Sequence, residues 1–194
     1  LYHGYGATEA LGITILGPEH HTADERGEKM MRSCGRPFRG VLLSIQGPDR
    51  KPVPIGEIGE VCIRSNSVMK GYWNKPHLTA DVMIDKWYHS GDAGFLDEKG
   101  FLTLVDRVKD MLITGGENVY SAEVENALMR HPAVEECAII GLPDEKWGEL
   151  VHAVVRLKAE ASVTGAELQQ FCRQHLAGYK VPKSVEFSER SLPK

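Results

Sequence analysis

The sequence lacks several features that would assign it to a particular class of protein. It contains no run of about 18 consecutive apolar residues, so no membrane-spanning helix is predicted, and no basic stretch followed by an apolar one marks a signal peptide. Positive charge is not in excess, with 23 Lys and Arg against 27 Asp and Glu and a net charge of −4, which argues against nucleic acid as a partner. The four cysteines (Cys34, Cys62, Cys137 and Cys172) match neither zinc-ligand nor secreted-disulfide spacing. We therefore expect a cytoplasmic protein with reduced thiols.

What is present is the composition of an ordinary globular protein, with 42% hydrophobic and 26% charged residues. A length of 194 residues allows one large domain or two small ones. The ends are unusual, because the chain starts at Leu1 rather than Met and residues 192–194 read as a turn rather than as the end of a capped element. These ends predict a piece of a longer protein.

Residues 40–107 have the pattern of short strands separated by turns. Residues 41–45 and 58–64 are rich in β-branched side chains and partly alternate. Residues 101–105 follow Glu-Lys-Gly at 98–100, which indicates a hairpin. We predict a small antiparallel, barrel-like β unit.

The pattern changes after Lys109 to mixed helices and strands. Ser121 is a candidate N-cap for a helix that a proline at 132 ends. Strands are predicted at 133–140 and 151–157, with Gly-Leu-Pro-Asp at 141–144 turning the chain between them.

A second helix is predicted to start at Thr164, which forms a capping box with Glu167, and to end at Gly178. Its apolar stripe runs from Leu168 to Leu176 at helical spacing. The predicted fold class is therefore α+β.

Three polar motifs are candidates for chemistry. Tyr-Gly-Ala-Thr-Glu at 5–9 offers a ring to stack on a base, a glycine that admits a ligand, and a hydroxyl and carboxylate suited to phosphate and Mg²⁺. Ser-Gly-Asp at 90–92 offers a carboxylate that can accept hydrogen bonds from a ribose diol. Either motif alone is also compatible with an ordinary turn. The run 106–125, with its Arg, Lys and double glycine ahead of a helix, is more specific. His89, beside the second motif, is interpreted as a packing or hydrogen-bonding residue, and its proximity to a nucleotide leaves a general base as the alternative.

Together these motifs resemble, in order, the signatures of the adenylate-forming superfamily. Within it, the sequence is most similar to fatty-acyl and related carboxylate–CoA ligases. The motifs that carry the resemblance are residues 5–9, 56–61, 71–76, 90–92, 106–125, 134–149 and 179–183.

The resemblance implies a two-step reaction that uses ATP, Mg²⁺ and coenzyme A. A carboxylate, from a fatty or related acid, attacks the α-phosphate of ATP to form acyl-adenylate and pyrophosphate, and the thiol of coenzyme A then displaces AMP. Two alternatives stay open, an adenylating domain that loads a carrier protein and a nucleotide-binding module without catalysis. The oligomeric state is not predicted.

The resemblance also assigns roles to individual residues of the first part. Tyr5 would stack on adenine, Gly6 would let the backbone approach the nucleotide, and Thr8 would contact phosphate. Glu9 would help hold Mg²⁺. Asp92 would bind the ribose hydroxyls, with the guanidinium at position 107 beside it.

The resemblance also places Arg107 in the nucleotide site. In the second part it makes Lys109 the hinge of a mobile domain, and Gly116 lines the tunnel for the pantetheine arm. The expected domains are 1–108, the β-rich, barrel-like end of a large N-terminal AMP-binding domain, and 109–194, a small mobile α+β C-terminal domain, truncated at its end.

Two departures from the family pattern stand out. Ser121 occupies a position where many relatives have Pro, and both residues start helices. The family's phosphate-gripping loop, most of its acyl pocket and its adenylation-step lysine fall outside these 194 residues. We therefore expect the chain by itself to be inactive in adenylation, since one lost donor already costs about 10²–10³ in rate.

Overall fold

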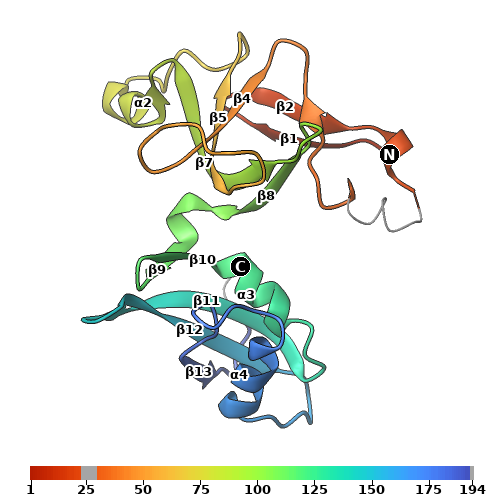
Figure 1. The fold of residues 1–194 in the computed structure, drawn as a ribbon, viewed down its shortest axis with the longest axis vertical. Helices are drawn as coiled ribbons and strands as arrows, with labels where there is room; N and C mark the ends of the chain where they lie inside the picture. Colours follow the sequence, from red (N-terminus) through yellow and green to blue (C-terminus); the bar gives the residue numbers. More distant parts are fainter. Residues whose placement is uncertain (23–29, 193–194) are drawn as a thin grey trace. The chain divides into compact units, whose positions relative to one another are not determined.

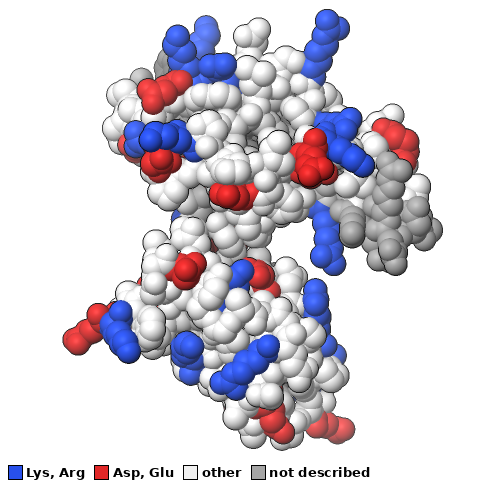
Figure 2. All heavy atoms as spheres, in the orientation of Figure 1, with Lys and Arg blue, Asp and Glu red and all other residues white. Residues whose placement is uncertain are grey.

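A computed structural model describes residues 1–22 and 30–192 of the chain. The chain divides into two compact units, Leu1–Val108 and Lys109–Lys194 (Figure 1). Among the described residues, no helix is both long and apolar enough to cross a membrane. The face drawn in Figure 2 carries basic and acidic side chains on both units, as expected for a net charge of −4.

The first unit begins with a three-stranded antiparallel sheet. It consists of β1 (His3–Ala7), β2 (Leu11–Leu16) and β3 (Arg36–Pro37), in that order. The glycine-rich sequence of β1 allows close approach to β2, because a Cβ at Gly4 would lie 2.9 Å from the carbonyl oxygen of Thr14. The first polar motif therefore starts on β1 and ends in the turn that follows it.

A second, five-stranded sheet holds the other polar motifs of this unit. Its order is β4-β5-β7-β6, and β8 also pairs with β7. A helix, α2 (Pro76–Val82), starts at a proline in its first turn. The strands are β4 (Leu42–Gln46), β5 (Gly59–Arg64), β6 (Met83–Ile84), β7 (Trp87–Leu96) and β8 (Leu102–Arg107).

The expectation of a barrel is wrong in one respect. Within the described residues the two sheets are open, because the strands at the ends of each sheet do not pair with each other. One buried core still joins them, since Ile13 of β2, Val61 of β5 and Leu102 of β8 all belong to it and are fully buried. The strand pattern predicted the elements, but closure depends on pairing between strands that are distant in sequence.

The second unit is a five-stranded sheet with two helices, as the α+β prediction requires. The sheet order is β10-β9-β12-β11, and β13 runs parallel to β12. A short 3-10 turn, Val108–Asp110, leads into it. The elements are β9 (Met111–Thr114), β10 (Glu117–Tyr120), α3 (Ser121–Leu128), β11 (Val134–Asp144), β12 (Gly148–Leu157), α4 (Gly165–Arg173) and β13 (Ser184–Phe187).

Both helices bury their apolar stripes against this sheet. Val124 and Leu128 of α3 and Leu168 and Cys172 of α4 are fully buried in one core with Val151 of β12 and its neighbours. Burying side chains of this size contributes about 1.5–3 kcal/mol each. The second unit thus has a core of its own.

The predicted turn at 141–144 is wrong. These residues continue β11 and pair with β12 as far as Gly148, and the turn falls at 145–147. Gly141 and Pro143 are tolerated in a strand because β11 lies at the edge of its sheet. The carboxylate of Asp144 makes the actual turn by accepting the backbone N–H groups of Lys146 and Trp147, at 2.9 and 2.8 Å.

The predicted helix starts are confirmed in one case and shifted in the other. Thr164 and Glu167 form the expected capping box at the start of α4. Ser121, by contrast, is the first residue of α3 rather than its N-cap, which is Tyr120. The second helix also ends at Arg173, earlier than the glycine at 178 suggested.

Candidate functional site

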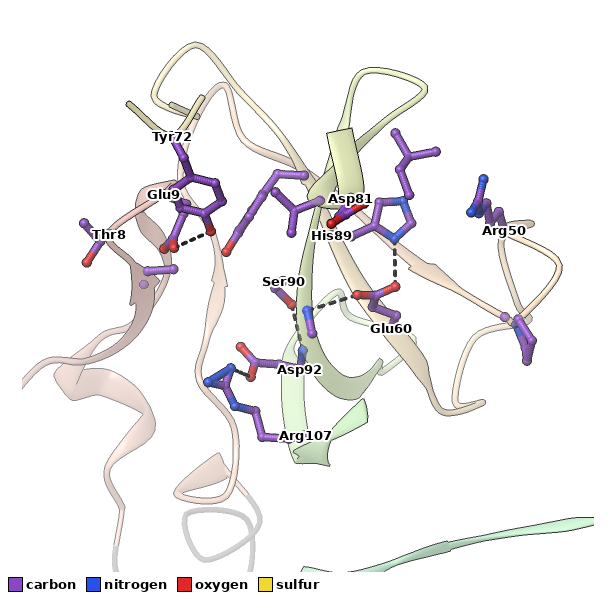
Figure 3. Close-up of a pocket in the computed structure, with 18 residues that line it drawn as sticks. Thr8, Glu9, Arg50, Glu60, Tyr72, Asp81, His89, Ser90, Asp92 and Arg107 are labelled. Atoms are coloured by element: carbon purple, nitrogen blue, oxygen red, sulfur yellow. Dashed lines mark hydrogen bonds and ion pairs between the residues drawn. The ribbon is translucent and has the colours of Figure 1, made fainter. Parts of the chain in front are cut away.

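A polar cavity of about 670 Å³ lies in the first unit (Figure 3). Its volume is in the range of small-molecule and cofactor sites. Residues from the first polar motif, from the second and from β8 meet there although they are up to about a hundred positions apart. The lining residues are Gly6, Ala7, Thr8, Glu9, Gly47, Pro48, Arg50, Glu60, Tyr72, Asp81, Val82, Ile84, Tyr88, His89, Ser90, Gly91, Asp92 and Arg107.

A bulge in β7 directs the second motif into this cavity. In the pairing of β5 with β7, Cys62 faces His89 and Glu60 faces Ala93. One residue on β5 therefore opposes the three residues 90–92, and the extra residues leave the ladder. Gly91 makes this possible with φ +72°, a conformation that other residues adopt only with strain. Asp92 lies at the end of this bulge.

Two groups hold the carboxylate of Asp92. Arg107, its cross-strand partner on β8, donates from Nη1 to Oδ1 at 2.9 Å. The hydroxyl of Tyr5 donates to Oδ2. Burial and this carboxylate together raise the pKa of Tyr5 well above its ordinary value, so the hydroxyl stays a donor. Asp92 retains acceptor capacity, because an ionised carboxylate offers about four lone-pair positions.

On another side of the cavity, Glu9 is oriented by Tyr72. The Tyr72 hydroxyl donates to Oε1 of Glu9 at 2.9 Å, and this hydrogen bond raises the pKa of Tyr72. The second carboxylate oxygen remains available for a ligand. Thr8, the preceding residue, also lines the cavity. A hydroxyl beside one carboxylate suits Mg²⁺ that is bound mainly through a substrate's phosphates.

The structure brings most of the predicted nucleotide residues together. Gly6, Thr8, Glu9, Asp92 and Arg107 all line the cavity. Tyr5 contacts Asp92 but is not among the lining residues, so its stacking on adenine stays a prediction.

The two remaining predicted residues belong to the second unit. Lys109 lies in the 3-10 turn that begins this unit. Gly116 lies in the turn between β9 and β10 with φ +83°, and no atom would meet a Cβ added there. The backbone N–H of the adjacent Gly115 donates to the carbonyl of Trp147 at 2.8 Å, which ties this turn to the β11–β12 hairpin.

Sequence reasoning missed several residues of the cavity, among them Tyr72 and Glu60. Tyr72 and Glu60 occur in stretches that carried the family resemblance, yet neither received a role. His89 was interpreted as a packing or hydrogen-bonding residue, with a general base as the alternative, and in the structure it forms a hydrogen bond with Glu60 at the cavity wall. No local signal in the sequence links Glu60 with His89, because they meet only through the pairing of β5 with β7, in which Cys62 faces His89 and Glu60 faces Ala93.

A cavity that combines a hydroxyl and carboxylate for phosphate and Mg²⁺ with a second carboxylate for a diol is the kind of site that binds a nucleotide. The chain belongs to the AMP-binding enzyme family. The family model for AMP-binding enzymes matches residues 1–73, and the model for the AMP-binding enzyme C-terminal domain matches residues 123–194.

Curated relatives agree with this assignment. The chain is 48% identical over 187 residues to a feruloyl-CoA synthase of an Amycolatopsis species, covering 96% of this chain and 37% of that protein. It is 43% identical to a 2-succinylbenzoate–CoA ligase of Geobacillus kaustophilus, covering 100% and 38%. A fatty acid–[acyl-carrier-protein] ligase of Streptomyces coeruleorubidus is 39% identical, with 98% and 36% covered. The chain thus spans little more than a third of these relatives.

Solved structures share the fold. An o-succinylbenzoate CoA synthetase of Bacillus subtilis, in complex with its acyl-adenylate intermediate, superposes with a TM-score of 0.86 at 36% identity, covering 100% of this chain and 38% of that one. The same enzyme with ATP and magnesium ion gives 0.84 at 34% identity, with the same coverage. An amide bond synthetase of Marinactinospora thermotolerans gives 0.84 at 38% identity, covering 99% and 38%.

Proposed function

We propose that the protein acts as an ATP-dependent, AMP-forming acid–CoA ligase. In the first step a carboxylate oxygen attacks the α-phosphorus of ATP and the bond to pyrophosphate breaks. In the second step the sulfur of coenzyme A attacks the acyl carbon, the bond to AMP breaks, and the thiol proton is released. The observation that carries the proposal is the meeting of Thr8, Glu9, Asp92 and Arg107 in one cavity.

The cavity residues suit the first step because adenylation needs positioning and charge neutralisation more than covalent help. Asp92, held by Arg107, presents oxygens to the ribose hydroxyls. Thr8 contacts phosphate, and Glu9, oriented by Tyr72, supplies one ligand to Mg²⁺. Magnesium would neutralise phosphate charge when bound. Tyr5 keeps Asp92 in place through its hydroxyl, and its ring would stack on the adenine base.

For the second step we propose a role for the second unit. Residues 1–108 would form the end of a large AMP-binding domain, and residues 109–194 a mobile domain that swings about Lys109. The unit boundary at Val108/Lys109 supports this division. Gly116 would line the path of the pantetheine arm, where the open space beside its Cα leaves room for a thiol.

For the carboxylic acid substrate, we propose a chemical class rather than a particular compound. The sequence favours a fatty or related acid, whereas the relatives named above act on ferulic and succinylbenzoic acids as well as fatty acids. An aromatic acid is therefore included beside the fatty acids.

A second candidate, transfer to a carrier protein, is favoured by one observation. The Streptomyces coeruleorubidus relative is a ligase for an acyl carrier protein rather than for coenzyme A. The cavity residues would have the same roles in that case, because both reactions share the acyl-adenylate.

The test uses the full-length protein encoded by the gene. Carboxylate-dependent ATP–pyrophosphate exchange measures adenylation, and chromatography of the products measures thioester formation with coenzyme A or with a phosphopantetheinylated carrier. The panel contains short, long-chain and aromatic acids. We expect exchange with at least one acid and thioester formation with coenzyme A.

A matched pair of variants links the activity to the cavity. Glu9→Gln should slow exchange by about 10²–10³-fold, the usual effect of removing one charge-stabilising group. Glu98→Gln makes the same chemical change at an exposed turn outside the cavity and should leave the rate unchanged. AMP binding without exchange for any acid would reject the ligase and favour a nucleotide-binding module.

A further inference from the structure

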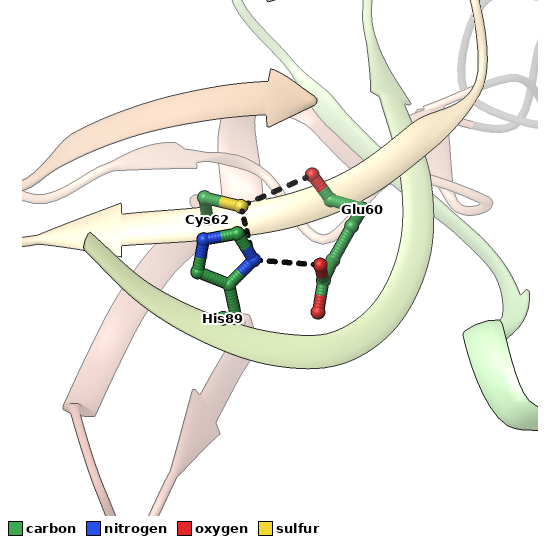
Figure 4. Close-up of side chains that lie close together, drawn as sticks. All are labelled: Glu60, Cys62 and His89. Atoms are coloured by element: carbon green, nitrogen blue, oxygen red, sulfur yellow. Dashed lines mark hydrogen bonds and ion pairs between the residues drawn. The ribbon is translucent and has the colours of Figure 1, made fainter. Parts of the chain in front are cut away.

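Glu60 spans the bulge that carries Asp92. It lies on β5 beside the bulge, and its two carboxylate oxygens bind Gly91 within the bulge and His89 just before it; Figure 4 shows the contact with His89. Oε1 accepts the backbone N–H of Gly91 at 3.0 Å, and Oε2 accepts Nδ1 of His89 at 2.7 Å. The Glu60 side chain is 25% exposed and that of His89 is 9% exposed, so both bonds are largely shielded from water.

Ser90 completes the support of the bulge. Its hydroxyl donates to the carbonyl of Val61 at 2.7 Å and accepts the backbone N–H of Asp92 at 3.1 Å. Two backbone N–H groups of the bulge, those of Gly91 and Asp92, are thereby satisfied by Glu60 and Ser90. Ser90 therefore holds the backbone of Asp92, whereas Glu60 holds the backbone of Gly91 and the side chain of His89.

Cys62 is the third member of this cluster. The distances within the cluster indicate a hydrogen bond between His89 and Glu60 rather than a metal site. The Sγ of Cys62 lies 3.4 Å from the same Nδ1 of His89, and the 2.7 Å separation of Nδ1 from Oε2 is a hydrogen-bond length with no room for an ion between them. Burial raises the pKa of Cys62 to about 12, so the thiol beside His89 is protonated.

We propose that Glu60 is a positioning residue for nucleotide recognition, which holds the Ser90–Asp92 bulge so that the Asp92 carboxylate meets the ribose diol. The inference rests on the proposed function, because it takes Asp92 to be the ribose-binding residue. Glu60 acts through His89 and Gly91, and removing it leaves the N–H of Gly91, the residue before Asp92, without its acceptor.

The readout is ribose selectivity, measured in the full-length protein by titration calorimetry with AMP and with 2′,3′-dideoxy-AMP. In the wild type, the hydroxyls should strengthen binding about 10- to 100-fold, as expected for hydrogen bonds to a charged group. Asp92→Ala should reduce this ratio to about one. Glu60→Ala should reduce it at least several-fold, while binding of dideoxy-AMP changes little.

Conservative variants separate positioning from general damage. Glu60→Gln keeps an acceptor for Gly91 and can donate to His89 in its other tautomer, so the ratio should recover. Glu60→Asp keeps the charge but is one methylene shorter and cannot span the bulge, so the ratio should fall. Thermal melting of each variant identifies a folding defect. If Glu60→Ala does not fold, the ribose selectivity of Glu60→Asp is the measurement that tests the proposal.

Cys62→Ala is the matched control from the same cluster. It removes the third group near His89 without touching either bond of Glu60 and should keep the wild-type ratio. A loss of selectivity in Cys62→Ala equal to that in Glu60→Ala would point to a shared ligand such as a metal and overturn the proposal.

The other outcomes separate the two proposals. A wild-type ratio in folded Glu60→Ala or Glu60→Asp would overturn the role of Glu60 and leave the ligase untouched. Failure of the wild-type protein to bind AMP at all would reject the proposed function itself.

Discussion

At the scale of single residues, the cavity works through pairs in which one side chain orients another. Tyr72 orients Glu9, and Arg107 orients Asp92. In each pair the carboxylate has oxygens left for a ligand, while its partner limits the rotamers that it can adopt. The sequence predicted both carboxylates, but Tyr72 could not be assigned to Glu9 because 63 positions separate them.

We predict that Tyr72→Phe weakens the use of Mg-ATP without removing it. The change deletes one hydrogen bond to a charged group, which contributes about 1.5–3 kcal/mol, and leaves the ring in place. The KM for Mg-ATP should rise about 10-fold or more in steady-state assays of the full-length protein. Trp73→Phe, at a neighbouring side chain that is 88% exposed, is the control and should change nothing. An unchanged KM in Tyr72→Phe would show that Glu9 needs no orienting partner.

The buried thiols predict a specific pH dependence of stability. Burial raises the pKa of Cys62 and Cys137 to about 12 and that of Cys172 to about 11. The folded state therefore keeps protons that the unfolded state releases above about pH 8.5. The contribution is fully present below that pH and is lost as the pH rises toward the folded values.

Urea unfolding at pH 8.0, 9.0 and 9.8 measures this effect. The free energy of unfolding should fall with pH by up to about 1.4 kcal/mol per pH unit for each such thiol. A variant with Ala at Cys62, Cys137 and Cys172 should show a shallower slope. The explanation fails if the variant and the wild type lose stability equally between these pH values.

At the scale of elements, short sequence motifs correctly predicted features that depend on contacts between residues close together in the chain. The capping box at Thr164 and Glu167 appeared as expected, since both bonds lie within four residues. Hydrogen bonds from the backbone and hydroxyl of Thr164 lower the pKa of Glu167. The prediction of a turn at 141–144 was wrong because these residues pair with β12, and this pairing outweighs the local preference of Gly and Pro for turns.

We predict that Thr164→Ala destabilises the second unit by about 1 kcal/mol. The substitution removes the acceptor for the Glu167 N–H and leaves an unpaired helix donor. Urea denaturation monitored by circular dichroism measures the difference. Thr164→Ser keeps the hydroxyl and should lie close to the wild type, and equal losses in both variants would exclude the cap as the cause.

At the scale of the whole molecule, two cores serve two units. Leu102 lies in the core of the first unit, which also supports the cavity, and Leu128 lies in the core of the second. All the residues that line the cavity belong to the first unit. A substitution that destabilises the second unit should therefore leave nucleotide binding by the first unit unchanged.

Leu128→Ala tests this separation. Removing a fully buried leucine should lower the free energy of unfolding of the second unit by about 2–5 kcal/mol, while AMP affinity measured by calorimetry below the unfolding temperature stays within about twofold. Leu102→Ala, an equally buried change in the first unit, should weaken AMP binding as well. Equal loss of AMP affinity in both variants would contradict the separation.

The amino-acid sequence alone was sufficient for the family, the α+β class and the cap of α4, because each depends on residue type and short spacing. Its assignment of residues to a nucleotide stays a prediction. Pairing of distant strands was decided only in three dimensions. It leaves both sheets of the first unit open, produces the bulge at 90–92, and places Glu60 beside that bulge on the neighbouring strand. The physical reason is strand register. Side chains on strands that are distant along the chain become neighbours only when those strands pair, and no local residue preference determines which residues will face each other.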